Sequence, residues 1–324
     1  MTITTNRRAL LGMPFLLLGA ARPALAQDYP NRPVRVIIGF AAGGATDIMA
    51  RLLSQRLSDR LGQPFVVENR PGAGTLLAAE LVARAAPDGH VLMYASSSTI
   101  ITPLINRSST LDPTRDFAAV ALCQASPLIL VANKDFPART IQDVVALARQ
   151  RPGQITVSHP GAGGINHLSV EVLARREGVS FTLVPFTGNQ PSLTALMRGD
   201  VNLASDSYFA TRPLLENGSI RAIATTGLRR SPVLPNVPTV AETLPGYEAI
   251  FWSGFLAPRG VPEPILERLN REVQDILKQP DVLEKLASFG ADPGGGGRED
   301  FTRQIAADWE RWGKVGRETG VSSN

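Results

Sequence analysis

Hydrophobic and polar residues alternate along this chain with two different periods. Short runs of apolar, often β-branched residues are typical of buried strands, and longer stretches with apolar residues every three or four positions are typical of helices. In the first third of the chain the strand-like runs cover 34–38, 65–67 and 91–94, and the helix-like stretches cover 48–61 and 76–85. The regular alternation predicts an α/β class with parallel strands.

A second run with the same alternation begins near residue 128. Its strand-like segments cover 128–131, 155–157, 181–184, 201–203 and 220–224, and its helix-like segments cover 141–149, 166–176 and 191–198. A proline-marked loop at 232–238 precedes a strand-like run at 251–256, and the tail is helical at 264–278, 282–289 and 300–316. This order predicts lobe 1 from residues 27–126 plus 246–324, with lobe 2, residues 127–245, inserted into it.

The first 26 residues have the pattern of an export signal. Arg7 and Arg8 precede an apolar run at 9–20, and Ala24-Leu25-Ala26 provides a small-x-small cleavage pattern. The run is shorter than the roughly 20 apolar residues that span a bilayer. We therefore expect cleavage near Ala26 and a soluble periplasmic protein, exported by either the general or the twin-arginine route.

Export changes what the composition implies. Removing the three arginines of the signal lowers the formal net charge from +4 to +1, so the basic balance does not argue for a nucleic-acid partner. Cys123 is the only cysteine, which excludes an intrachain disulfide in an oxidising compartment. Its apolar surroundings predict a small buried side chain.

Two glycine-rich loops each follow a predicted strand and precede a predicted helix. Such glycines allow backbone N–H groups to turn toward a ligand, and a helix N-terminus favours an anion. One such loop per lobe predicts a small carboxylate held across a cleft, although glycines that merely turn the chain are the alternative. The candidate ligand-binding residues are Phe40, Gly43, Gly44, Thr46 and Asp47 in the first loop, and Ser158, His159, Gly161, Gly163, Gly164 and His167 in the second.

Several polar side chains have a structural interpretation beside the ligand-binding one. His167 either braces its loop by a hydrogen bond or contacts the ligand, and Asp47 either favours its helix N-terminus or contacts the ligand. The hydroxyls of Ser96, Ser97 and Ser98 either face the first loop or form a polar turn. Asp206 either accepts from a ligand amine or hydroxyl, or caps a helix.

Other kinds of site lack necessary parts. Neither loop has the lysine of a phosphate-binding loop, and the second loop misses the last glycine of the dinucleotide fingerprint. There is no G-x-S-x-G nucleophile elbow. The three histidines are scattered and the single cysteine has no partner for a metal cluster. We therefore expect no enzyme activity, no cofactor and no metal.

Beyond these features, a set of stretches matches one family in order along the chain: residues 29–35, 40–47, 61–74, 86–89, 184–188 and 230–242. With them the mature chain resembles, over essentially its whole length, the substrate-binding proteins of tripartite tricarboxylate transporters, the Bug family of periplasmic solute receptors. The resemblance implies a two-lobed periplasmic-binding-protein fold, type II-like. It also implies that ligand carboxylates are held between the lobes by backbone amides, hydroxyls and bridging waters.

The resemblance places the two loops, the serine run and Asp206 at family ligand positions. The sequence departs from the family at Ala42, His159, Gly164 and Thr187, where Pro, Ser, Ser and Lys are usual. His159 either adds a titratable donor to the cleft or is only the extended residue before Pro160.

The favoured hypothesis is a monomeric receptor that closes on a small carboxylate and delivers it to an inner-membrane transporter. Closure would be a hinge motion of the strands near 126–131 and 246–257. The alternatives are a receptor that docks a sensor-kinase ectodomain and an exported enzyme that uses the same cleft. Trp252 and Phe255 either line the distal part of the pocket or lie in a core strand.

Overall fold

The computed structural model describes residues 29–161 and 163–320. The expected export segment lies outside these residues. The strands are β1 (Val34–Ile38), β2 (Phe65–Asn69), β3 (Val91–Ser96), β4 (Phe117–Asn133), β5 (Thr156–His159), β6 (Thr182–Pro185), β7 (Leu203–Ser207), β8 (Ile220–Thr225), β9 (Ile250–Pro258) and β10 (Asp292–Pro293). The helices are α1 (Ala45–Leu61), α2 (Leu76–Ala83), α3 (Ser97–Ile105), α4 (Pro113–Asp116), α5 (Ile141–Gln150), α6 (Ile165–Glu177), α7 (Asn189–Arg198), α8 (Tyr208–Glu216), α9 (Glu263–Ile276), α10 (Pro280–Ser288) and α11 (Arg298–Thr319).

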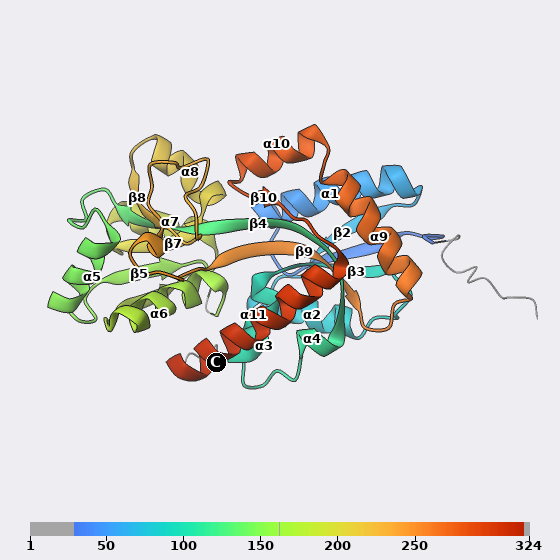
Figure 1. The fold of residues 1–324 in the computed structure, drawn as a ribbon, viewed down its shortest axis with the longest axis horizontal. Helices are drawn as coiled ribbons and strands as arrows, with labels where there is room; N and C mark the ends of the chain where they lie inside the picture. The colour runs from blue at the N-terminus through green and yellow to red at the C-terminus, as the bar shows by residue number, and fades with distance from the viewer. Residues whose placement is uncertain (1–28, 162, 321–324) are drawn as a thin grey trace, which may run out of the picture.

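The strands form one curled sheet in the order β2-β1-β3-β9-β4-β7-β5-β6, with β8 and β10 also paired to β4. β1 is parallel to β2 and β3, and β5 is parallel to β6 and β7, as βαβ connections require. The prediction of parallel strands is wrong for β4, β8 and β9, which pair antiparallel. Figure 1 shows the result as two halves joined by β4 and β9. The first half contains β1–β3, α1–α4 and α9–α11, and the second half contains β5–β8 and α5–α8.

β4 is a single strand of 17 residues that belongs to both halves. Residues 117–127 pair with β9, and residues 128–133 pair with β7 and β8. The strand-like run that the sequence predicts at 128–131 is only the last part of this strand. The strand continues because Pro127, which has no N–H to donate, lies where the β9 ladder ends.

Thr226 fixes the place where the chain crosses between the halves. Its backbone N–H donates to the carbonyl of Leu128 at 2.9 Å, and its carbonyl accepts from the N–H of Ala249 at 2.9 Å. Its hydroxyl accepts from the N–H of Leu128 at 2.7 Å. Leu128 in β4 and Ala249, the residue before β9, are thus both held by one threonine.

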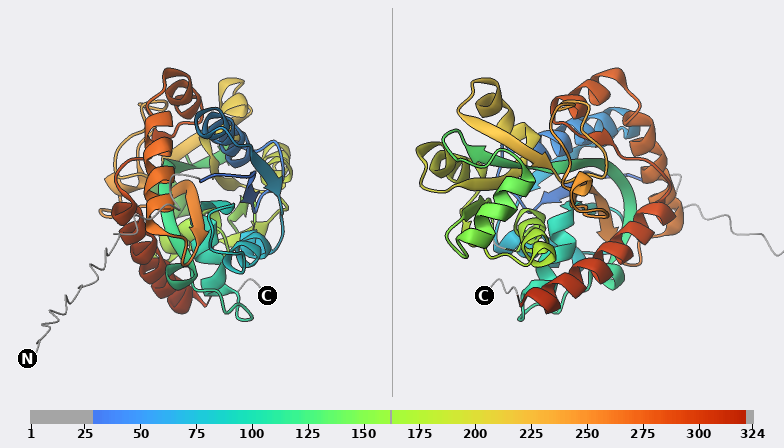
Figure 2. Two further views of the ribbon diagram at one scale, coloured as in Figure 1. Left: turned by 90° about the vertical axis from the view of Figure 1, so that its right-hand side faces the viewer. Right: turned by 60° about the vertical axis from the view of Figure 1, so that its left-hand side comes forward.

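Hydrophobic side chains form separate cores in the two halves and one cluster between them. The shared cluster is built from Ile101, Leu128, Ile165, Leu168, Ala249 and Trp312. Trp312 lies on α11, which runs along the molecule and contacts both α3 and α6 (Figure 2). This cluster therefore lies beside the crossing strands and joins α3 and α11 to α6.

Three sequence predictions about buried side chains can be compared with the structure. Trp252 and Phe255 are 1% and 0% exposed in β9 and lie in the cores of the first half. Of the two interpretations, a pocket lining and a core strand, the structure shows the core strand for both. Cys123 is fully buried, as predicted.

Within the described residues no helix is both long and apolar enough to cross a membrane.

Gly254 gives a test of this packing. It lies in β9 between β3 and β4, and a Cβ at this position would lie 2.4 Å from the Ala121 carbonyl oxygen and 2.9 Å from Cζ of Phe301. We expect Gly254→Ala to lower the free energy of unfolding by about 1–3 kcal/mol, because neither neighbour can move freely. Urea unfolding followed by circular dichroism measures this loss.

Gly295→Ala is the matched control, since a Cβ at this position would meet no described atom within 4 Å and its φ lies outside the left-handed region. It should change the free energy of unfolding by less than about 0.5 kcal/mol. Equal effects of the two variants would contradict the packing described for β9.

Candidate functional site

The first predicted loop turns at Gly43, whose φ is +89°, and leads into α1. Gly44 is the N-cap residue with φ −80° and ψ 167°. The N–H of Gly43 donates to Oδ2 of Asp47, four residues further on, at 3.0 Å. A side chain in the first turn of the helix thus holds the loop that precedes it.

The carboxylate of Asp47 is buried, with 4% of the residue exposed, and is fully engaged. It accepts from Nε of Arg51 at 3.1 Å and from Nδ2 of Asn69 at 2.9 Å. Burial alone would raise the pKa of Asp47, but these donors and the Gly43 N–H outweigh it and keep the pKa below its usual value. Asn69 also donates to the carbonyl of Phe40 at 3.1 Å, so it joins both ends of the loop.

The second predicted loop has the same geometry with a different acceptor. Gly163 has φ +78°, and Gly164 is the N-cap of α6 with φ −80° and ψ 174°. The N–H of Gly163 donates to Nδ1 of His167, again four residues further on and again at 3.0 Å. The hydrogen bond of His167 is the bracing role that the sequence offered for it, and Asp47 has the same role in addition to its place in the first turn of its helix. We call these two hydrogen bonds the glycine braces.

His159 is buried against the second glycine brace. Its ring stacks on that of His167 with centroids 4.5 Å apart and an interplanar angle of 6°. Its Nδ1 lies 2.8 Å from the Gly161 carbonyl, which can only accept, so this nitrogen carries the hydrogen. Burial first, and then the neighbouring His167, lower the pKa of His159 to about 4. His159 is therefore neutral at physiological pH and supports the loop from inside.

The serine run begins a helix and is not a plain turn. Ser96 ends β3, and Ser97 and Ser98 start α3. Oγ of Ser96 and Oγ of Ser97 are buried without a hydrogen-bond partner among the described residues. A Cβ placed on Gly164 would lie 3.2 Å from Oγ of Ser98, so the two halves touch here. The glycine at position 164 thus leaves room for the approach of α3.

Thr75 supports the same region from a strained conformation. Its φ is +84°, in the left-handed region that β-branched residues rarely adopt. It is 2% exposed, and its Oγ1 lies 3.4 Å from Oγ1 of Thr99, which accepts from the N–H of Ser96 at 3.2 Å. A cost of about 1–3 kcal/mol is typical of such a residue. Sequence reasoning did not identify Thr75, although its neighbours Gly72 and Gly74 signalled an unusual turn.

Asp206 lies at the end of β7, completely buried. Its Oδ1 accepts from Nδ2 of Asn189 and, at 2.7 Å, from the N–H of Ser207. Its Oδ2 has no partner among the residues that the structure describes. Burial raises the pKa of Asp206 to about 6 in spite of these donors. A buried carboxyl with one free oxygen is a group that a ligand or water can satisfy.

Asn189 is a functional candidate that sequence reasoning missed. It is the first residue of α7 and follows Gly188, whose φ is +113°. Strand β6, this glycine and α7 repeat the strand, glycine and helix order of the two predicted loops. That order was the signal that could have found it.

The remaining predicted residues take other places. Ser158 is fully buried inside the second half, where its Oγ accepts from Oγ of Ser192 at 2.8 Å and its own hydroxyl faces the Leu203 carbonyl at 3.4 Å. Phe40 packs on the core of the first half, and Thr46 is 8% exposed at the start of α1. Gly161 has open space around it, with no described atom within 4 Å of a Cβ.

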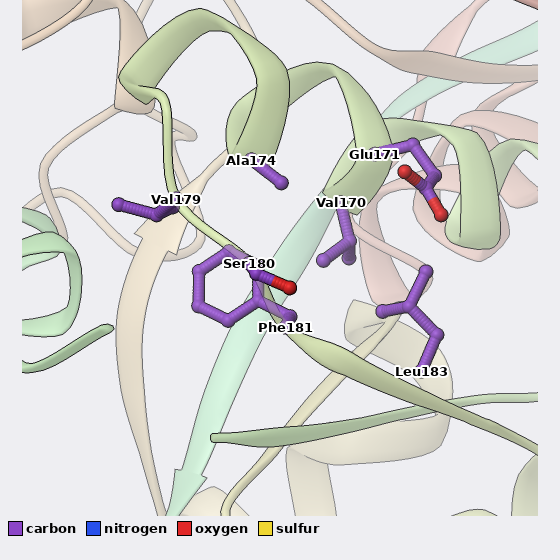
Figure 3. A pocket seen from close by; sticks show the side chains of 7 residues that line it. All are labelled: Val170, Glu171, Ala174, Val179, Ser180, Phe181 and Leu183. Atoms are coloured by element: carbon purple, nitrogen blue, oxygen red, sulfur yellow. The ribbon is translucent and has the colours of Figure 1, made fainter. Parts of the chain in front are cut away.

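Two cavities lie outside the predicted loops. One of about 210 Å³ lies against α6 and β6, and Figure 3 shows the side chains that line it: Val170, Glu171, Ala174, Val179, Ser180, Phe181 and Leu183. One of these lining residues, Glu171, also contacts the second loop, because its Oε1 lies 3.6 Å from Nε2 of His167. The other, of about 360 Å³, lies between α9 and the start of α11. In the described part of the chain, no three potential metal ligands come together.

The chain is similar to a curated protein and to solved structures. BugT of Bordetella pertussis is 33% identical over 98% of this chain and 98% of that protein. The structure of R. palustris Rpa4515 with adipate is 37% identical, covers 91% of this chain and 99% of its own, and superposes with a TM-score of 0.83. MatC from Rhodopseudomonas palustris with bound malate is 36% identical, covers 89% and 99%, and has a TM-score of 0.80.

The family model described as the tripartite tricarboxylate transporter family receptor matches residues 49–321. Together with the structural neighbours, this match confirms the type II-like periplasmic-binding-protein fold expected from the sequence. The chain belongs to the tripartite tricarboxylate transporter receptor family.

Proposed function

We propose that this protein is a periplasmic receptor that captures a small carboxylate between its two halves and delivers it to an inner-membrane transporter of the tripartite tricarboxylate type. The observation that carries the proposal is the pair of glycine braces, one in each half, at equivalent helix N-termini. The adipate and malate held by two similar proteins support a carboxylate as the ligand.

Each brace prepares a helix N-terminus for an anion. The first N–H groups of a helix have no intrahelical acceptor, and the helix dipole adds positive potential there. Because the brace binds the glycine N–H, the amides that follow it keep a fixed direction. Micromolar affinity needs about 8 kcal/mol, and hydrogen bonds to a charged group contribute about 1.5–3 kcal/mol each. Several amides from α1 and α6 would therefore suffice without an arginine.

Three buried groups add polar contacts of a different kind. The hydroxyls of Ser96 and Ser97 have no partner in the described part of the chain and can donate to a carboxylate, and Oδ2 of Asp206, which also has none there, can accept from a ligand hydroxyl or ammonium. Residues 29–126 with 246–320, and residues 127–245, would act as the two lobes. The crossing at Thr226 would be their hinge.

A ligand screen tests this function directly. We expect mono-, di- or tricarboxylates to raise the melting temperature of the mature protein, and neutral analogues of the same acids to leave it unchanged. A ligand at a hundredfold excess over its Kd stabilises by about 2.7 kcal/mol. Thermal shift followed by calorimetric titration measures both quantities. Stabilisation by the neutral amides alone would overturn the proposal.

The braces themselves can be tested by substitution. Asp47→Ala and His167→Ala each release one glycine N–H, and we expect each to weaken carboxylate binding by about tenfold, equivalent to about 1.4 kcal/mol. The control is Asp143→Ala, which removes a similar first-turn carboxylate at α5, where it accepts from the N–H of Thr140 at 3.0 Å. Calorimetric titration should show unchanged affinity for the control. Equal losses in all three variants would mean that the braces have no special role.

Asp206 gives a prediction about pH. Its pKa of about 6 in the folded protein is above its ordinary value of 3.8. Protonation of Asp206 therefore stabilises the folded protein, and this stabilisation is fully present below pH 4 and is lost as the pH rises through 6. A pKa difference of one corresponds to about 1.4 kcal/mol, so the folded protein loses about 3 kcal/mol across this range. Asp206→Asn removes this loss.

The measurement is the difference in unfolding free energy between Asp206→Asn and wild type, obtained from urea unfolding at several pH values. The difference should rise in favour of the variant between pH 4 and pH 7 by up to about 3 kcal/mol. Asp143→Asn serves as the control because backbone and hydroxyl donors lower the pKa of Asp143. Ionised Asp143 stabilises the folded protein, so the difference in unfolding free energy should change with pH in the opposite direction. A flat difference for Asp206→Asn would contradict the raised pKa.

A further inference from the structure

Two successive residues of α8 pack into the cores of different halves. Tyr208 packs against the second-half core that contains Ile129 and Leu193. Phe209 packs against the first-half core that contains Leu53 and Phe289. The N-terminus of α8 is therefore a contact between the halves, although α8 follows β7 in the second half.

The partners of this contact lie at the end of α10. The rings of Phe209 and Phe289 have centroids 4.7 Å apart and an interplanar angle of 74°, which is an edge-to-face arrangement. Gly290 has φ +65°, and a Cβ there would lie 2.9 Å from Cδ1 of Tyr208. Figure 1 shows α8 and α10 at the top of the molecule, on the opposite side from α11.

This contact is joined directly to the candidate ligand site. Ser207 donates its N–H to Oδ1 of Asp206 at 2.7 Å, and its Oγ accepts from the N–H of Ala210 at 3.4 Å as the N-cap of α8. The buried carboxyl of Asp206 and the two aromatic side chains thus belong to four consecutive residues. A shift of the carboxyl when a ligand binds would move the start of α8.

The other apolar contact between the halves differs in its position relative to the crossing strands. The cluster of α3, α6 and α11 includes Leu128 and Ala249, which belong to the crossing itself. Among the described residues, the ring pair and the glycine approach that join α8 to α10 include none of the crossing segments. A rotation about the crossing would therefore move α8 and α10 apart more than it would move the members of the cluster that contains Leu128 and Ala249.

We propose that Tyr208 and Phe209, packed on Phe289 and Gly290, form a latch that holds the two halves closed and retains the bound ligand. The latch rests on the proposed function for its role in ligand retention. These residues act as positioning residues, because they hold the lobes that carry the ligand contacts. Contacts that form only on closure stabilise the closed state and slow release more than capture.

The first test needs no ligand. Cys123 is the only cysteine and is fully buried, so spin labels can be attached to Gln55→Cys on α1 and Arg198→Cys on α7. We expect Phe209→Ala to shift the distance distribution of the labels toward longer distances. Phe209→Leu, which keeps an apolar side chain, should shift it less. The control is Phe181→Ala, a half-buried phenylalanine of the second half that lines the cavity against α6.

The second test uses adipate and malate as probes. We expect Phe209→Ala to release the bound probe about tenfold faster than wild type in stopped-flow displacement, with association changed by less than about threefold. Phe289→Ala should give a similar effect, and the double variant should add little, because both substitutions remove the same ring pair. Phe181→Ala should release the probe at the wild-type rate.

The outcomes separate the latch from the proposed function. An unchanged distance distribution in Phe209→Ala overturns the latch, whether or not a ligand has been found. If the probes bind to wild type but leave Phe209→Ala at the wild-type rate, the latch is wrong and the receptor function stands. If no carboxylate binds to wild type, the proposed function fails, and a shifted distance distribution still supports the contact as the element that closes the two halves.

Discussion

The structure depends on the hydrogen bonding of β4, which pairs with different strands in the two halves of the sheet. Buried backbone N–H and C=O groups must be paired, so a strand that leaves one ladder needs another at once. β4 meets this need by pairing with β9 up to Pro127 and with β7 and β8 from Leu128 onward. Thr226 bonds to Leu128 of β4 and to Ala249, the residue before β9, where the ladders change. The two halves can therefore have separate hydrophobic cores and still be joined at a defined place, the crossing of β4 and β9. The direction of these strands determines which surfaces of the two halves face each other.

The two loops show that one backbone geometry can be built with different chemistry. Both have a glycine with positive φ, an N-cap glycine in extended conformation and an acceptor four residues after the first glycine. Asp47 brings a negative charge, which Arg51 partly balances at 3.0 Å. His167 accepts through an unprotonated Nδ1, so this brace adds no negative charge beside its helix N-terminus. The stacked ring of His159 keeps that imidazole in place.

Sequence reasoning predicted those features that depend on neighbouring residues. The strand, glycine and helix order located both loops, and the position of His167 in a first helical turn made bracing one of its two expected roles, whereas for Asp47 the sequence suggested only a favourable charge at the helix N-terminus or ligand contact. It could not find Asn69 or Asn189, because their partners Asp47 and Asp206 are 22 and 17 residues away. It also could not find the partner of Ser158, whose hydroxyl accepts from Ser192 of α7, 34 residues away. The antiparallel course of β9 depends on partners more than a hundred residues distant, which no local pattern encodes.

Asp206 illustrates why the site and the closure of the halves are difficult to separate. A fully buried carboxyl whose second oxygen has no partner among the described residues destabilises the folded chain when it is ionised. Its donors, the amide of Asn189 and the N–H and hydroxyl of Ser207, come from the N-termini of α7 and α8. The same carboxyl therefore orders both helix starts, one of which continues into the aromatic contact with α10. A group that satisfied the free oxygen would remove the unfavourable interaction and stabilise the arrangement of β7, α7 and α8 together, so recognition and closure use the same few residues.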